Sequence, residues 1–351
     1  MSEETVIQVD KLKKHFPLKK GFLETFVSKE VMTVKAVDGI SFSVKKGEIL
    51  GIAGESGSGK TTTGRLLLRL VQPTEGSIFF NGMTFSKLSE SEQKFYKDKL
   101  EVNGIDITKL KDTELKPLRR DMQIIFQDPF ESLDPRMTIK EIVAEPLRVQ
   151  KVCKNEDEVE ERVKAIMRDV EVVPPEEFMR RYPHELSGGQ RQRIAVARAF
   201  VLDPKFVVAD EPVSMLDVSI RAEIVNLMID LVKKRGASVV FITHDLAVTK
   251  HVCDRVIVMY LGKMMEMASS TNLIDLPLHP YTKALIAAVP VPDPSYRRTE
   301  VIGGEIPSPV NPPPGCRFNT RCPFAHTRCI SEEPPLIEVE KDHFVACHLY
   351  T

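Results

Sequence analysis

The sequence lacks an excess of charge of either sign, because 49 basic residues stand against 50 acidic ones and give a formal net charge of −1. Nucleic-acid binding depends on a basic surface, so a nucleic acid is not an expected partner. Long apolar runs are also missing: stretches such as 206–209 and 256–261 fall far short of the ~20 residues of a membrane-spanning helix. The first ten residues are acidic and polar, unlike a secretory signal. These absences predict a cytoplasmic chain that does not itself span a membrane.

Cysteine is scarce as well, with six in 351 residues, but four of the six lie near the end of the chain. They are Cys316, Cys322, Cys329 and Cys347. A disulfide framework is unusual in a cytosolic chain of this size, and a metal site is the commoner use of such a cluster. The spacing C-x5-C-x6-C-x17-C lacks the C-x2-C pairs of most zinc sites. Spacing alone therefore leaves an iron–sulfur cluster, zinc and free thiols open.

The rest of the composition is that of a folded α/β protein, with 42% apolar and 28% charged residues. We expect a strand pair over 31–44 bent at Asp38-Gly39, strands over 48–53, 206–209 and 238–243, and helices over 61–71, about 190–201, 220–234 and 281–288. Residues 138–181 have a helical pattern, and the hydrophilic stretch 83–118 contains an irregular surface insertion. Proline is frequent between residues 277 and 314, which marks a small appended region with little core that needs a staple.

A glycine-rich segment, GESGSGKT, lies between a predicted strand and a predicted helix and fits the phosphate-binding pattern G-x-x-x-x-G-K-[ST]. Backbone N–H groups and the helix N-terminus would hold the phosphates of ATP. Lys60 would reach the β- and γ-phosphates, and Thr61 would bind Mg²⁺. The residues predicted to bind ATP here are Gly54, Glu55, Ser56, Gly57, Ser58, Gly59, Lys60, Thr61 and Thr62.

Two carboxylates follow the apolar run 206–209. Asp210 at the strand end suits a contact to Mg²⁺, and Glu211 suits a base that orients the attacking water. The alternative is that these carboxylates only cap the following helix. This alternative is less favoured in a sequence that also contains the phosphate loop.

A second anion-binding helix start is predicted at LSGGQ, where Ser187, Gly188, Gly189 and Gln190 open a helix. The alternative is a serine-capped helix with no ligand. Two anion sites and two carboxylates exceed what one nucleotide needs, whereas two chains meeting head to tail would use all of them.

These motifs, in this order, resemble the ATP-binding subunits of ABC transporters, for which LSGGQ is the signature. The resemblance implies that Gln127 in IIFQDPF contacts the Mg²⁺ site and senses membrane subunits. It also implies that His244 contacts the γ-phosphate and that Asp217 belongs to the D-loop, in which Met215 replaces the usual alanine. Phe16 aligns with the aromatic residue that stacks on adenine, although it could instead be ordinary core.

Within the family, the segments SLDPRMTIKEIVAEPL, RYPHELSGGQRQRIAVARA and LPLHPYTKALIAAVP resemble the importers of di- and oligopeptides. Nickel and oligosaccharide importers look similar, so the solute stays open. The branch implies a [4Fe–4S] cluster on the four C-terminal cysteines. It also implies these partners: a second ABC ATPase subunit, copy or homologue, two transmembrane permeases and an extracytoplasmic solute-binding protein. The chain would lie peripherally on the cytoplasmic face of the membrane.

The expected architecture is an α/β P-loop ABC ATPase domain over residues 1–265, with a helical subdomain about 132–200, and a Cys-rich C-terminal extension over 266–351. In the expected reaction Glu211 polarises water, while His244 and Lys60 hold the γ-phosphate. The segment 138–181 would dock a membrane subunit. A competing class is an ABC-type ATPase without a channel. We expect the remaining histidines to be loop or surface residues: His184, His279, His326, His343 and His348.

Overall fold

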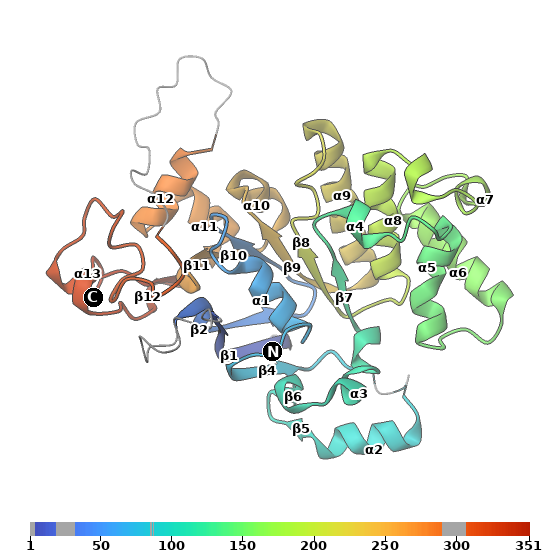
Figure 1. The fold of residues 1–351 in the computed structure, drawn as a ribbon, viewed down its shortest axis with the longest axis horizontal. Helices are drawn as coiled ribbons and strands as arrows, with labels where there is room; N and C mark the ends of the chain where they lie inside the picture. The colour runs from blue at the N-terminus through green and yellow to red at the C-terminus, as the bar shows by residue number, and fades with distance from the viewer. Residues whose placement is uncertain (1–3, 19–31, 85, 87, 290–306) are drawn as a thin grey trace, which may run out of the picture. The chain divides into compact units, whose positions relative to one another are not determined.

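The computed structural model of the chain describes residues 4–18, 32–84, 86, 88–289 and 307–351 (Figure 1). The chain divides into two compact units, each built from three stretches of sequence. The first unit comprises Met1–Gln8, Ser43–Ile49 and Phe79–Ile242, and the second comprises Val9–Phe42, Leu50–Ile78 and Thr243–Thr351. Within the described residues, no helix combines the length and the apolar character needed to cross a membrane.

The first unit contains a parallel sheet made of buried apolar runs. Its strands are β7 (Met122–Ile125), β8 (Phe206–Asp210) and β9 (Ser238–Thr243), in the order β9-β8-β7. All residues of β8 are buried, as expected for a strand covered on both faces. The pairing of β8 with β9 runs from Phe206↔Ser238 to Asp210↔Ile242, so Asp210 lies at the carboxyl end of the central strand. The strands predicted at 206–209 and 238–243 are confirmed.

Helices in the same unit pack on this sheet and on one another (Figure 1, green to yellow). The long ones are α5 (Ile139–Val149), α6 (Glu156–Asp169), α8 (Gly188–Phe200) and α9 (Val218–Arg235). The short ones are α4 (Pro129–Ser132), α7 (Pro175–Phe178) and the 3₁₀ turn Pro183–Glu185. Thr138 and Glu141 form a capping box that starts α5, and Gly236 ends α9 with a φ of 62°. The helices predicted over 138–181, 190–201 and 220–234 are confirmed.

The stretch predicted to be irregular, 83–118, is more ordered than its sequence indicates. It contains α2 (Glu90–Asp98), β5 (Leu100–Glu101), β6 (Gly104–Asp106), α3 (Asp112–Leu115) and the 3₁₀ turns Ile107–Lys109 and Leu118–Arg120. Residues 85 and 87 lie outside the described residues. A Ser89–Glu92 capping box starts α2, and the ring of Tyr96 is buried. Phe79 of β4 (Glu75–Phe80) pairs with Asp106 of β6, so one antiparallel ladder organises this stretch.

The second unit has a sheet in the order β12-β13-β11-β10-β3. Its strands are β3 (Ile49–Ala53), β10 (Arg255–Tyr260), β11 (Lys263–Ser269), β12 (Ile337–Glu340) and β13 (His343–Val345). Strand β10 is parallel to β3 and antiparallel to β11. Its helices are α1 (Lys60–Leu67), α10 (Leu246–Val252), α11 (Ser270–Asp275), α12 (Pro280–Ala287) and α13 (Thr327–Ser331). The strand–loop–helix order around residues 48–71 and the helix near 281–288 are confirmed.

The predicted strand pair over 31–44 is wrong. Residues Thr33–Lys45 form one strand, β2, which lies beside β1 (Thr5–Pro17). Gly39 adopts a φ of 82° within β2, so its conformational freedom serves the strand rather than a hairpin turn. Val31 lies outside the described residues.

The C-terminal region has more core than its composition suggests. Strand β13 extends the sheet of the second unit by pairing with β11 at Met267↔Phe344. Tyr260, Tyr281 and Phe318 are almost fully buried, and their ring centroids lie 4.7–5.4 Å apart. Sheet extension and this aromatic cluster join the region to the rest of its unit.

Candidate nucleotide-binding site

The glycine-rich loop of the second unit leaves β3 and enters α1. Gly54 has a φ of 149°, and a Cβ added there would lie 2.2 Å from the carbonyl oxygen of Met259. Gly59 has a φ of 103°, and its added Cβ would lie 2.1 Å from the carbonyl oxygen of Ala36. Real Cβ atoms do not come so close to backbone oxygen, so both positions need glycine. The loop can therefore pass close to β10 and β2.

Lys60 begins α1 and turns its ammonium group back into this loop. Its Nζ donates to the carbonyl oxygens of Gly54 at 2.7 Å and Glu55 at 2.9 Å, and the residue is only 5% exposed. The loop also contains a buried Ser58 hydroxyl that has no hydrogen-bond partner among the described residues. Buried hydroxyls nearly always have a partner, so this one fits a loop that a ligand oxygen completes. Cation, hydroxyl and helix start together suit a phosphate group.

The other loop residues are accessible. Ser56 and Gly57 are exposed, and Thr61 and Thr62 are half-buried in the first turn of α1. The hydroxyl groups at this helix start can donate hydrogen bonds to phosphate oxygens, and their oxygens can serve as ligands of Mg²⁺.

Glu55 is held by residues from the last quarter of the chain. Its N–H donates to Tyr281 Oη at 2.9 Å. Its carboxylate accepts two hydrogen bonds from Arg321, from Nη1 at 2.7 Å and from Nη2 at 3.2 Å. The pKa of Arg321 is held above its ordinary value by the hydrogen bond to Glu55, despite the opposing effect of burial. The loop is therefore positioned from outside as well as by its own glycines.

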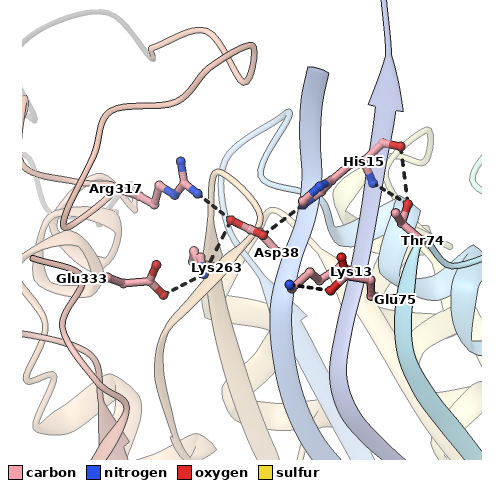
Figure 2. Close-up of polar contacts among 8 residues, drawn as sticks. All are labelled: Lys13, His15, Asp38, Thr74, Glu75, Lys263, Arg317 and Glu333. Carbon is pink, nitrogen blue, oxygen red and sulfur yellow. Dashed lines mark hydrogen bonds and ion pairs between the residues drawn. The ribbon is translucent and has the colours of Figure 1, made fainter. Parts of the chain in front are cut away.

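A buried carboxylate, Asp38 of β2, joins three further segments of the second unit (Figure 2). Its Oδ1 lies 2.9 Å from His15 Nε2, and its Oδ2 accepts from Arg317 Nη2 at 2.6 Å and faces Lys263 Nζ at 3.6 Å. Burial acts to raise the pKa of Asp38, but these neighbours and Lys35 hold it below its ordinary value. Asp38 thus connects the C-terminal segment to the strand that carries Phe16.

Phe16 and His244 also lie in the second unit. Phe16 is 39% exposed at the end of β1, with Lys14 Nζ 4.9 Å from its ring centroid, so it is not a core residue. His244 is exposed in the turn between β9 and α10. Both side chains are accessible to a ligand.

The two predicted carboxylates lie in the first unit, at the end of β8. Asp210 is 4% exposed, whereas Glu211 is half-buried. Glu211 has a φ of 45°, a left-handed conformation that is uncommon for residues other than glycine. Its N–H donates to the carbonyl of Ile242 at 3.0 Å, and its Oε2 accepts from Gln127 Nε2 at 3.3 Å. The structure therefore brings Gln127 and Glu211 together.

The signature residues open α8 in the first unit. Ser187 Oγ accepts from the N–H of Gln190 at 3.3 Å, and Gln190 Oε1 accepts from the N–H of Ser187 at 3.0 Å. This capping box supports the serine-cap alternative, but it uses only part of the helix start. A Cβ added at Gly189 would lie 2.8 Å from Ile220 Cγ2, whereas one at Gly188 would lie at an ordinary 3.6 Å from Leu216. Gly189 therefore allows α8 to approach α9.

Apolar side chains near these motifs are exposed. Met215, beside Asp217 at the start of α9, is 62% exposed, and Val218 is 81% exposed. Phe130, three residues after Gln127, is 62% exposed, and the guanidinium of Arg191 lies 3.8 Å from its ring centroid. Exposed apolar residues around polar motifs are typical of surfaces that contact other proteins.

The predicted [4Fe–4S] cluster is not supported. In the part of the chain that the structure describes, no group of three or more histidine, cysteine or acidic side chains is placed to hold a metal ion. The four C-terminal cysteines carry free thiols there. Burial raises the pKa of Cys316 to about 12 and also raises the pKa values of Cys322 and Cys347.

The expectation that the remaining histidines are loop or surface residues is wrong for His343, which lies in β13, while His279 and His348 lie in loops but are buried. His279 and His343 are 1% and 0% exposed, and His348 is 7% exposed. Glu266, itself fully buried, accepts from the N–H of His279 at 2.9 Å and lies 2.7 Å from His343 Nε2. The buried carboxylate of Glu266 thus provides polar partners for His279 and His343, whose burial the surrounding sequence does not indicate.

Sequence reasoning missed Tyr281, Arg317 and Arg321. Tyr281 lies in a segment typical of the peptide-importer branch, which could have indicated a role. The two arginines lie among the cysteines, and their partners are 279 and 266 residues away in the sequence, so no local pattern reveals them.

A glycine-rich loop between a strand and a helix, a carboxylate after a buried apolar strand and a helix opened by LSGGQ are the features of a P-loop nucleotide hydrolase of the ATP-binding-cassette class. A family model described as ABC transporter matches residues 37–214, and one described as oligopeptide/dipeptide transporter, C-terminal region, matches residues 265–329. The chain belongs to the ABC transporter family and is an ABC-type ATPase. The resemblance expected from the sequence is confirmed.

Individual relatives agree with this assignment. The chain is 46% identical over 353 residues to the oligopeptide transport ATP-binding protein AppF of Bacillus subtilis, covering 100% of this chain and 99% of that protein. A dimeric post-hydrolysis structure of the ATP-binding cassette MJ0796, bound to ADP and Pi, matches with a TM-score of 0.60 and 27% identity over 75% of this chain and 98% of that one. The cbiO1 structure from Clostridium perfringens shares the fold, with a TM-score of 0.60 and 24% identity over 78% and 92% of the two chains. The expected ABC ATPase fold is confirmed.

Proposed function

We propose that this chain binds and hydrolyses ATP as the energising subunit of an importer for di- and oligopeptides. The name of its Bacillus subtilis relative and the match of its C-terminal region to the oligopeptide/dipeptide model support peptides as the solute. These similarities favour peptides over the oligosaccharide or nickel alternatives. The domain boundary at residue 265 and the helical subdomain at about 132–200 remain predictions.

The observation that carries the hydrolytic role is the setting of Glu211. Its left-handed backbone and its contact with Gln127 fix a carboxylate at the end of a buried strand. Strained backbone of this kind persists where a side chain must be aimed. In the proposed reaction Glu211 accepts a hydrogen bond from water, aligns it for attack on the γ-phosphate and takes up its proton.

The phosphate loop binds the nucleotide in this scheme. On ATP binding Lys60 exchanges the carbonyls of Gly54 and Glu55 for phosphate oxygens, and Ser58 gains a partner. Phe16 stacks on adenine and His244 donates to the γ-phosphate.

Mg²⁺ would offset the charge of the phosphates. In the second unit Thr61 offers a hydroxyl ligand, and in the first unit Asp210 and Gln127 offer a carboxylate and an amide oxygen, which are donors that Mg²⁺ prefers. That the three meet at one ion remains a prediction.

The signature helix start, Ser187 to Gln190, would bind the nucleotide held by a second ABC ATPase subunit, a copy or a homologue, with Asp217 beside it. The exposed ring of Phe130, three residues after Gln127, supports docking of two transmembrane permeases, and an extracytoplasmic solute-binding protein would deliver the solute. The chain would then lie peripherally on the cytoplasmic face of the membrane. Closure of two such subunits on ATP would drive the permeases, and hydrolysis would reset them.

The test is Glu211→Gln in the full chain, with phosphate release and ATP binding measured side by side. We expect turnover to fall at least about a hundredfold with ATP binding retained. Glu176→Gln, an exposed residue of α7, is the matched control and should hydrolyse ATP normally. Wild-type turnover by Glu211→Gln would refute the assignment of the base.

The solute is tested in cells that carry Lys60→Ala in place of the wild-type chain. Uptake of a labelled tripeptide should be lost while uptake of nickel and oligosaccharide continues. The opposite pattern would refute the peptide assignment.

A further inference from the structure

Glu55 of the phosphate loop uses all three of its polar groups. Its N–H donates to Tyr281 Oη, its carbonyl accepts from Lys60 Nζ at 2.9 Å, and its carboxylate binds Arg321. In the proposed function Lys60 must leave this carbonyl to reach a phosphate. The side chains of Tyr281 and Arg321 then continue to hold Glu55.

Arg321 is fixed in a way that surface arginines are not. Its side chain is 5% exposed, and its guanidinium lies 5.8 and 5.9 Å from the ring centroids of Tyr260 and Phe318. Nη1 also donates to Tyr260 Oη at 3.3 Å. Two hydrogen bonds to one carboxylate set the orientation of both groups, and the aromatic rings leave the arginine little freedom to move.

The negative charge of Glu55 lies in the phosphate loop and is offset by the positive charge of Arg321. A carboxylate in a loop that receives phosphates repels them, because like charges at short range disfavour binding. Arg321, from the C-terminal segment, balances that charge through its two hydrogen bonds to the carboxylate of Glu55.

The C-terminal segment has a second, independent attachment. Arg317, four residues earlier in the sequence, pairs with Asp38 at 2.6 Å (Figure 2). The N–H of Lys35 in β2 donates to the carbonyl of Pro309 at 3.2 Å. Removing Arg321 therefore leaves the segment attached, so an effect on nucleotide binding reports on Glu55.

We propose that Arg321 is a positioning residue of the nucleotide site, which holds the phosphate loop and neutralises Glu55 so that the loop accepts the phosphates of ATP. The proposal rests on the proposed function, because it assumes that this loop binds ATP. It gives the C-terminal region a part in nucleotide binding.

The test compares Arg321→Met, which keeps the length of the side chain, with the double variant Glu55→Gln/Arg321→Met. We expect Arg321→Met to raise the Kd for a fluorescent ATP analogue about tenfold, a change in affinity that is common when one site influences binding at another. The double variant should return to within about threefold of wild type, because the unbalanced charge is gone. Arg328→Ala, an exposed arginine of α13 paired with Glu332, is the matched control and should bind like wild type.

Steady-state kinetics of ATP hydrolysis distinguishes a positioning role of Arg321 from a general loss of folded structure. We expect Arg321→Met to raise KM for ATP with kcat at saturating ATP retained, and Arg321→Lys to recover part of the loss. Unfolding midpoints of all variants show whether each one is folded. Wild-type affinity in a folded Arg321→Met, or a double variant no better than the single one, would overturn the proposal. Failure of the wild-type chain to bind ATP would instead refute the proposed function and, with it, this inference.

Discussion

Gln127 Nε2 donates a hydrogen bond of 3.3 Å to the carboxylate of Glu211. The two residues are 84 positions apart and follow neighbouring parallel strands, β7 and β8, whose carboxyl ends meet at one edge of the sheet. The contact links a residue expected to sense the membrane subunits to the proposed base.

Gln127→Glu should move the pH dependence of ATP hydrolysis. Two carboxylates at this distance cannot both be ionised easily, so the pair retains a proton to higher pH. The acid limb of the kcat profile should therefore move upward by about one pH unit or more. Gln127→Ala, which removes the amide without adding charge, should leave the limb in place. Superimposable profiles for the two variants would contradict the pairing.

Gly189→Ala should destabilise the chain although alanine is the better helix former. Its Cβ would lie 2.8 Å from Ile220 Cγ2, so α8 or α9 must shift. We expect a loss of about 1–3 kcal/mol in the free energy of unfolding, measured in urea. Gly188→Ala is the control, because its Cβ would meet Leu216 at 3.6 Å, and its stability should stay within about 0.5 kcal/mol of wild type.

Removing the obstructing side chain provides the second test of that contact. In the Gly189→Ala background, Ile220→Ala should cost less than it does alone, because it relieves the clash. Strict additivity of the two changes would show that the α8–α9 approach does not limit residue 189.

The phosphate loop, the carboxylates and the signature could be located in the sequence because each is a short local pattern with its own secondary structure, while the roles of their residues remain predictions. Strand β8 and helix α8 appear where apolar runs and a serine cap place them. The strand pair over 31–44 fails because Gly39 can serve a turn or a continuous strand, and only the neighbouring strands decide between them.

Long-range contacts could not be predicted from such patterns. Arg321 and Glu55 are 266 residues apart, and the buried partners of Glu266 come from two different segments. The clustering of four cysteines suggested a metal, and the proline-rich composition implied a weak core for a metal to staple, whereas Tyr281 and Phe318 contribute core there from positions separated by a proline-rich stretch.

Asp38→Asn should destabilise the second unit and change its response to acid. The variant leaves the buried guanidinium of Arg317 without its countercharge, which should cost about 3 kcal/mol. Glu75→Gln is a control in the same region, since the Lys13–Glu75 pair is exposed and contributes little. Urea unfolding at neutral pH measures both.

The sign of the pH effect follows from the lowered pKa of Asp38. A folded-state pKa below the ordinary one gives stability that is present above the ordinary pKa of about 4 and is lost as pH falls through the folded value. Wild type should therefore lose stability below about pH 4 more steeply than Asp38→Asn. Equal slopes for the two proteins would contradict the role of the ion pairs.

His279 should make the stability depend on pH in a higher window. Burial lowers its pKa from 6.5 to about 4, although Glu266 acts in the opposite direction. The folded chain thus resists protonation that the unfolded chain accepts, so stability is full above pH 6.5 and falls toward pH 4. A shift of this size corresponds to about 3 kcal/mol across that window.

His279→Asn isolates this contribution. His279 Nδ1 accepts the N–H of Tyr281 at 3.0 Å and caps α12, and asparagine is a good N-cap that does not titrate. We expect the variant to unfold with a flatter pH dependence between pH 6.5 and 4 while its helix cap is kept. His184→Asn, at an exposed position, should match the wild-type curve. If His279→Asn and wild type lose stability in parallel over this range, the buried imidazole does not set the acid response. Tyr281 of the capped helix also holds Glu55, so unchanged ATP binding in the variant would confirm that the cap is intact.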